Sequence, residues 1–114
     1  VTDDAWQSWR TEPFNTKQLS VRDDVSGTLF LTDLATPEIS LVDPSAAVKI
    51  TLNFAQAPKH RYVALWSKSN SDPFYCIEPW TALPNSLNRK QSELIHLAAG
   101  ETFEAGMWLN VSRA

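Results

Sequence analysis

Alternation of apolar and polar residues in short runs constrains the fold of this chain more than any other feature of its sequence. In residues 48–54 every second residue is apolar, and the residues between them are Lys, Thr and Asn. The last run is the cleanest, with Phe103, Ala105, Met107, Leu109 and Val111 on one face. A period of two is typical of β-strands that are buried on one side. The opposite face of the last run carries Thr102, Glu104, Gly106, Trp108 and Asn110.

The whole pattern predicts one all-β domain over residues 1–114, folded as a mainly antiparallel β-sandwich. Residues 61–67 are apolar on both faces, which is typical of a central strand. Only Trp6–Thr11 and Arg89–Glu93 are expected to form a helical turn or two, and residues 1–25 are expected to be an irregular arm. The expected strands, separated by turn signals, are 28–32, 38–42, 48–54, 61–67, 73–78, 94–97 and 102–111.

Charge and cysteine content exclude several classes of function. The net charge is −3 and no basic cluster is present, so we expect no nucleic-acid partner and no anionic membrane surface. No apolar run approaches the length of a membrane span. Cys76 is the single cysteine, so an intrachain disulfide is impossible, and we predict a reducing, cytoplasmic location.

Several kinds of catalytic site have no signal in the sequence. We find no metal-ligand spacing and no Ser/His/Asp arrangement, and three glycines make a phosphate-binding loop improbable. The sequence therefore predicts no metal and no cofactor. Five tryptophans are a high number for 114 residues. Most are expected in the core and the sheets, although aromatic faces also stack on sugar rings.

Glu78 is the strongest candidate for a catalytic residue. It follows the apolar residues Phe74–Ile77 at the end of an expected strand, and Pro79 and Trp80 come next. A carboxylate in such a place costs free energy unless it is paired or used, and enzymes often place a general base there. The structural alternative is a glutamate that caps a turn or pairs with Arg89 or Lys90.

The run Phe-Tyr-Cys-Ile-Glu-Pro-Trp at residues 74–80 resembles the C-terminal motif of the aldose 1-epimerase, or galactose mutarotase-like, family. Pro84-Asn85 and Leu87-Asn88 follow it as in that motif. The upstream run Val63–Ser67 is similar to the family's apolar strand ending in Trp. The downstream run Leu97–Phe103 is similar to its turn before the closing strand, with Ala99 where the family usually has Pro.

This resemblance covers about residues 28–111 and implies both a fold and a reaction. Family members are large antiparallel β-supersandwiches that bind an aldose, such as glucose or galactose, and interconvert its anomers by acid–base ring opening without a cofactor. By motif position Glu78 would be the general base. Trp80 and Asn85 would contact the sugar, and Asp33 is the candidate for the family's hydroxyl-binding aspartate, with Asp23 and Asp24 behind it.

The histidines depart from the family pattern. Neither His60 nor His96 matches a catalytic position, so the chain carries the base and lacks the acid. We therefore expect the C-terminal part of an epimerase-like domain, either a product of proteolysis or a segment completed by its N-terminal part as a second chain, or else a small protein that forms a homodimer. The alternatives are a non-catalytic carbohydrate-binding β-sandwich and, third, a structural β-module whose motif is accidental.

Overall fold

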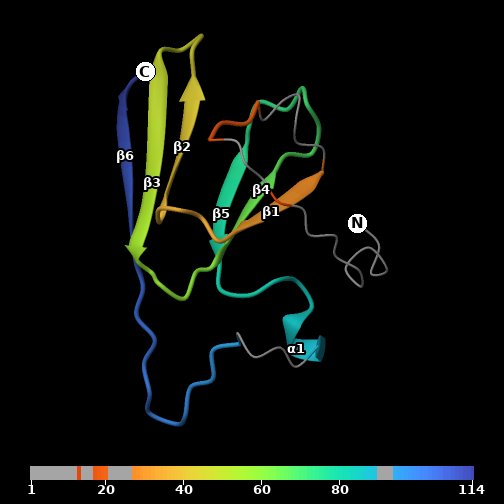
Figure 1. Cartoon of the computed structure of the whole chain (residues 1–114), viewed down its shortest axis with the longest axis vertical. Helices are drawn as coiled ribbons and strands as arrows, with labels where there is room; N and C mark the ends of the chain where they lie inside the picture. Colours follow the sequence, from red (N-terminus) through yellow and green to blue (C-terminus); the bar gives the residue numbers. More distant parts are fainter. Residues whose placement is uncertain (1–12, 14–16, 21–26, 90–93) are drawn as a thin grey trace.

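The chain forms two antiparallel three-stranded sheets and one short helix in a computed structural model that describes residues 13, 17–20, 27–89 and 94–114. Figure 1 shows the sheets next to one another, with β6 at the outer margin. We call the sheet of order β1–β4–β5 sheet A and the sheet of order β2–β3–β6 sheet B. This arrangement confirms the predicted all-β, sandwich-like fold. The elements are β1 (Thr28–Thr32), β2 (Glu38–Asp43), β3 (Val48–Gln56), β4 (Tyr62–Trp66), β5 (Cys76–Trp80), α1 (Ser86–Arg89) and β6 (Gly106–Arg113).

Strand β4 is the central strand of sheet A, as its apolar sequence predicted. Val63, Ala64 and Leu65 are all buried, with exposed fractions of 0%, 2% and 2%. Strands β1 and β5 flank it, both antiparallel to it. Because β1 and β5 run in the same direction, their C-terminal ends meet at the same end of the sheet.

The expected strand 73–78 is displaced in the structure. Strand β5 begins at Cys76 and continues through Pro79 to Trp80, so Glu78 lies in the middle of the strand and not at its end. A proline is tolerated there because β5 is an edge strand, where a missing N–H on the open side needs no partner. Pro79 is paired with Val63 of β4.

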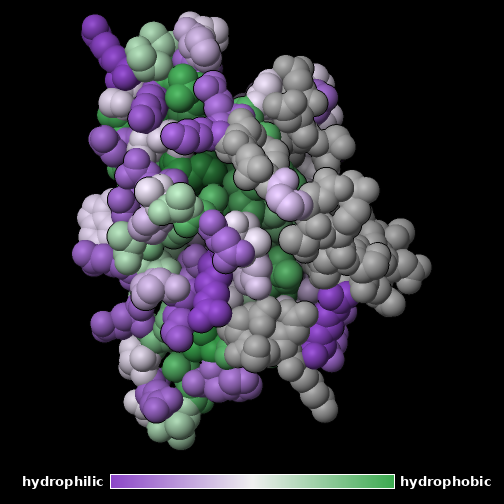
Figure 2. Space-filling view, viewed as in Figure 1, coloured by the Kyte–Doolittle hydropathy of each residue, from purple (hydrophilic) through white to green (hydrophobic). Residues whose placement is uncertain are grey.

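The core lies between the facing sides of the two sheets. It is built on Phe54, Ala57, Val63 and Leu65. Figure 2 shows apolar residues in a band along the middle of this view, with polar residues along the margin of sheet B. The Cα radius of gyration is 15.7 Å, above the roughly 13 Å of a compact domain of this length, so the chain is more extended than a compact domain. The half-buried residues packed against it are Leu19, Leu29, Leu31, Ile39, Leu52, Tyr75 and Ile77.

Strand β6 closes sheet B but is shorter than expected. It begins at Gly106 and not near Thr102. Its apolar face continues that of β3, because Leu109 is opposite Leu52 and Val111 is opposite Ile50. Leu109 and Val111 nevertheless remain 66% and 60% exposed. The alternation thus predicted the strand and its faces, while the core stops before it reaches this edge.

The predicted strand 94–97 is wrong. Residues 94–105 contain no strand, and Figure 1 shows them crossing below both sheets from α1 toward β6. A strand needs a neighbour to satisfy its backbone groups, and this segment runs past the ends of the sheets. The run Leu97–Phe103 does contain a turn, at Ala99-Gly100, since Glu101 N donates to Ala98 O at 3.0 Å and Gly100 has a φ of 87°.

Two helical turns were predicted, at Trp6–Thr11 and at Arg89–Glu93. The prediction at Arg89–Glu93 is displaced, because helix α1 spans Ser86–Arg89. Residues 90–93 of that segment lie outside the described residues. The first, Trp6–Thr11, also lies outside them. So do Asp23, Asp24 and most of the predicted arm.

Candidate functional site

The outer face of sheet A carries Glu78 among aromatic side chains. Residues paired directly across neighbouring strands point to the same side of a sheet, so the register places Phe30, Ala64 and Glu78 in one cross-strand row. The next rows on this face are Thr32, Tyr62 and Trp80 on one side and Thr28, Trp66 and Cys76 on the other. The opposite face of the sheet packs against the core, so Glu78 points away from the core.

Trp80 holds the carboxylate of Glu78. Its indole Nε1 donates a hydrogen bond of 3.0 Å to Glu78 Oε2, as two residues apart on one strand face can do. Both side chains are half-buried. The indole is in turn packed edge-on against Phe30, with ring centroids 5.3 Å apart and an interplanar angle of 73°. Glu78 is therefore oriented by a side chain that is itself fixed.

Cys76 lies on the other side of Glu78 along β5. Burial raises the pKa of the Cys76 thiol, and the negative charge of Glu78 and a hydrogen bond to it raise that pKa further. A raised pKa keeps the sulfur protonated, and a thiol is a poor nucleophile. Cys76 is a free, half-buried cysteine, and a protonated thiol in this place is a poor candidate for a nucleophile.

The other two predicted sugar contacts lie toward the same end of sheet A as Trp80. Asp33 directly follows β1, is exposed and has a φ of 53°. Asn85 stands at the start of α1, where its carbonyl oxygen accepts the N–H groups of Asn88 and Arg89, each at 3.1 Å. Its side-chain oxygen accepts a hydrogen bond from the Asn88 amide, and its φ is 63°. Asn85 thus has a structural task at the helix start.

Neither histidine belongs to the cross-strand rows of sheet A around Glu78. His60 lies four residues before Ala64, the partner of Glu78, which corresponds to on the order of 10 Å along a strand. Its ring lies against Phe103, with centroids 6.3 Å apart. Its Nδ1 is buried and, among the described residues, has no hydrogen-bond partner. His96 is exposed in the segment that follows α1.

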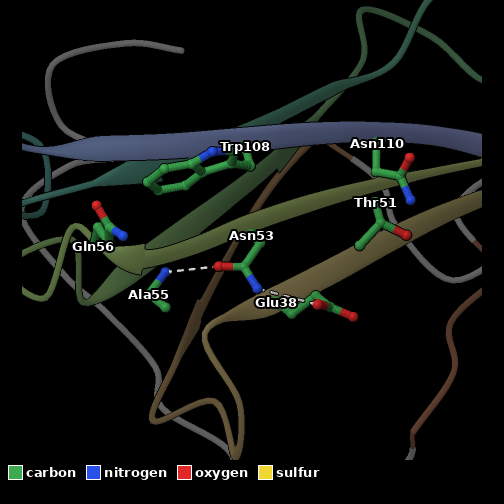
Figure 3. Close-up of a pocket in the computed structure, with 7 residues that line it drawn as sticks. All are labelled: Glu38, Thr51, Asn53, Ala55, Gln56, Trp108 and Asn110. Atoms are coloured by element: carbon green, nitrogen blue, oxygen red, sulfur yellow. Dashed lines mark hydrogen bonds between the residues drawn. The ribbon is translucent and has the colours of Figure 1, made fainter.

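A pocket lies on sheet B, and the sequence analysis did not predict it. Its volume is about 410 Å³, and it opens on the outer face of sheet B (Figure 3). One signal was available, because Trp108 falls on the polar side of an alternating strand. The residues that line the pocket are Glu38, Thr51, Asn53, Ala55, Gln56, Trp108 and Asn110.

The described residues contain neither a candidate metal site nor a candidate membrane-spanning helix. In that part of the chain, no group of three or more His, Cys, Asp or Glu side chains is placed to hold a metal ion. Over the same residues, no helix has the length and apolar character needed to cross a membrane.

The chain was also compared with known proteins. No family model, no curated protein and no solved structure matches it.

Proposed function

We propose that this chain is an aldose 1-epimerase-like protein that interconverts the α and β anomers of an aldose, with Glu78 as the general base. The observation that carries the proposal is the hydrogen bond from Trp80 to Glu78 Oε2. It holds the carboxylate in a fixed orientation on an aromatic face, where a carboxylate can act as a general base. The resemblance of residues 74–88 to the family motif is the reason to propose an aldose as the substrate.

The reaction needs one base and one acid. Glu78 takes the proton of the anomeric hydroxyl, the O–H electron pair forms the C1 carbonyl, and the bond between C1 and the ring oxygen breaks. The ring oxygen takes a proton from an acid, which is a histidine in the family. Rotation about the C1–C2 bond and the reverse transfers give the other anomer. Such general acid–base steps need no cofactor.

The second candidate is a carbohydrate-binding β-sandwich without turnover. The positions of the histidines favour it, because a general acid must come within hydrogen-bond reach of the ring oxygen. His60 is separated from the Glu78 row by on the order of 10 Å of chain and packs on Phe103. In the first proposal the acid comes from a second chain that carries the N-terminal part of the domain, or from the partner in a homodimer.

The sugar contacts and the location are proposals as well. Trp80 would form a wall beside the aldose, and Asp33 and Asn85 would bind hydroxyl groups at the same end of sheet A. The free thiol of Cys76 fits a reducing compartment such as the cytoplasm.

The test is the rate at which fresh α-glucose or α-galactose mutarotates, followed by polarimetry or NMR. The proposal expects acceleration above buffer by the wild type, none by Glu78→Gln, and full activity in Glu104→Gln, an exposed carboxylate in the segment before β6. Turnover that survives in Glu78→Gln contradicts the base assignment. If the wild type gives no acceleration but binds methyl glucoside, which cannot mutarotate, the binding protein is the better description.

A further inference from the structure

We propose that the outer face of sheet B is a second carbohydrate site, which binds a neutral oligosaccharide by stacking one sugar ring on Trp108. The site is separate from Glu78, because Glu78 belongs to the outer face of the other sheet. The proposal therefore does not depend on the epimerase activity.

Strand register builds the site from two adjacent cross-strand rows. Glu38, Asn53 and Trp108 are paired across β2, β3 and β6 and form the first row. The second row is Ser40, Thr51 and Asn110. Neighbouring strands are about 4.8 Å apart and successive rows on one face about 6.7 Å apart. The two rows thus cover an area on the scale of one pyranose ring and its hydroxyl groups.

Gly106 allows the indole of Trp108 to lie along the sheet. A Cβ atom at residue 106 would come within 3.0 and 3.2 Å of two atoms of the six-membered ring, and within 3.4 Å of Gln56 Cβ. Figure 3 shows the indole extending toward Gln56. The side chain remains 51% exposed, so the strand presents part of a broad aromatic surface to solvent.

A bulge in β3 fixes the polar neighbour of this ring. The register shifts between Asn53 and Gln56, where β3 uses one more residue than β6. Asn53 Oδ1 accepts the backbone N–H of Ala55 at 3.0 Å, and its Nδ2 donates to Glu38 Oε2 at 3.2 Å. These two bonds set the orientation of the amide. Bulges often occur next to binding sites, where they aim a side chain.

The chemistry of the lining selects the ligand. Glu38 is the one ionisable residue in it, so an anionic ligand is repelled. The remaining polar groups are the amides of Gln56, Asn53 and Asn110 and the hydroxyl of Thr51, which together can donate to and accept from sugar hydroxyls. Sugar C–H groups carry partial positive charge and match the negative face of an indole.

The openness of the site favours a chain of sugars over a single one. A small ligand normally has most of its surface enclosed, but here the floor is a sheet and the flanks are solvent. One ring can cover Trp108 while its neighbours extend along or across the strands. We therefore expect weak binding of monosaccharides and stronger binding of oligosaccharides.

The experiment is isothermal titration of the whole chain with three neutral probes: cellohexaose, xylohexaose and maltohexaose. We expect at least one to bind, Trp108→Ala to weaken it by about tenfold or more, and Asn110→Ala to weaken it less. The control is Lys49→Ala, on the same face but outside the lining. Glu78→Gln is expected to bind like the wild type. If Trp108→Ala fails to fold, Trp108→Phe replaces it, and the Trp108 indole N–H signal of the wild type is followed by NMR during the titration.

Three results would contradict the proposal. One is the absence of binding by all three probes at millimolar concentration. Another is equal affinity in Trp108→Ala, or equal affinity in Trp108→Phe together with a wild-type Trp108 indole signal that the probe does not move. Tighter binding of a sulfated heparin hexasaccharide than of any neutral probe contradicts the assigned ligand class.

Discussion

The two sheets have the same number of strands and the same antiparallel pairing, yet they use their outer faces differently. Sheet A has a buried central strand, and Glu78 lies half-buried among the aromatic side chains of its outer face. Sheet B has a polar outer face with a single broad aromatic side chain, Trp108, that is half exposed to solvent. Its edge strand β6 leaves Leu109 and Val111 in water even on the side that continues the core.

Because of this difference, we expect sheet A to contribute more to the stability of the fold and the outer face of sheet B to be free for ligand binding. Sheet A supplies Val63 and Leu65 to the core, so its geometry is held by packing, and a carboxylate there can be oriented for chemistry. Sheet B contributes less packing at β6, so substitutions there change the surface without dismantling the fold. The predictions below test this contrast.

The largest expected effect is on the free energy of unfolding. Leu65→Ala removes a side chain that is 2% exposed, and deletions of this size cost about 2–5 kcal/mol. The matched control is Leu109→Ala, the same substitution at a residue that is 66% exposed, with an expected loss of about 0.5 kcal/mol or less. Urea unfolding followed by circular dichroism measures both. Equal losses in the two variants would remove the contrast between the sheets.

A second, smaller effect on the free energy of unfolding tests the position of the Trp108 ring. Gly106→Ala places a Cβ atom 3.0 Å from the indole, so the half-exposed ring has to shift by a few tenths of an ångström, and we expect a loss of about 1 kcal/mol in the free energy of unfolding. In the double variant with Trp108→Phe the smaller ring relieves the clash, so the cost of the alanine shrinks. A double-mutant cycle on unfolding free energies gives this coupling. Additive losses would mean that the ring does not lie over Gly106.

The hairpin between β2 and β3 gives a pH-dependent effect. Asp43 Oδ1 accepts bonds from Ser45 Oγ at 2.6 Å, Ser45 N at 2.9 Å and Ala46 N at 3.2 Å. The hydrogen bonds from the Ser45 side chain and from Ala46 hold the pKa of Asp43 below its ordinary value of 3.8. A carboxyl with a lowered pKa stabilises the fold above its unfolded value, and the stabilisation disappears as the pH falls through the folded pKa.

The wild type is therefore expected to be more stable than Asp43→Ala near neutral pH, and this advantage shrinks as the pH falls below 3.8. Thermal unfolding of both proteins across that range measures the difference. A difference that grows in acid would contradict the hydrogen-bonded carboxylate.

The smallest expected effect is on the rate at which Cys76 is alkylated. Burial is the first cause of its raised pKa and Glu78 the second, so Glu78→Gln is expected to lower that pKa partway toward the ordinary value of 9.0. More thiolate then forms at a fixed mildly alkaline pH, and alkylation by iodoacetamide becomes faster. Glu104→Gln should leave the rate unchanged. An unchanged rate in Glu78→Gln as well would mean that the two side chains are not neighbours on β5.

Local patterns predicted the parts of the fold that depend on local sequence. The apolar run at 61–67 identified the central strand, and the expected strand 73–78 contained Cys76 and Glu78, which lie on one face of β5. The strand at 94–97 failed because an apolar run becomes a strand only where a sheet edge receives it. The start of β5 at Cys76 depends on where its pairing with β4 begins, which the sequence of β5 alone does not specify.

Of the two candidate sites, one could be predicted from local sequence and the other could not. Glu78 was found because a motif surrounds it, and its bond to Trp80 follows from their spacing of two residues. The pocket on sheet B was missed because its members come from β2, β3 and β6. Their proximity depends on the register of three strands and on a bulge at Asn53. No run of neighbouring residues contains that information.

The most direct test of the account is an NMR titration that follows the indole N–H signals of Trp80 and Trp108 in the same sample. Each signal is assigned by a Trp→Phe substitution. The account predicts that methyl glucoside shifts the Trp80 signal and that the neutral hexasaccharide which binds shifts the Trp108 signal. Shifts of one indole by both ligands, or of neither, would contradict the claim that each sheet carries its own sugar site.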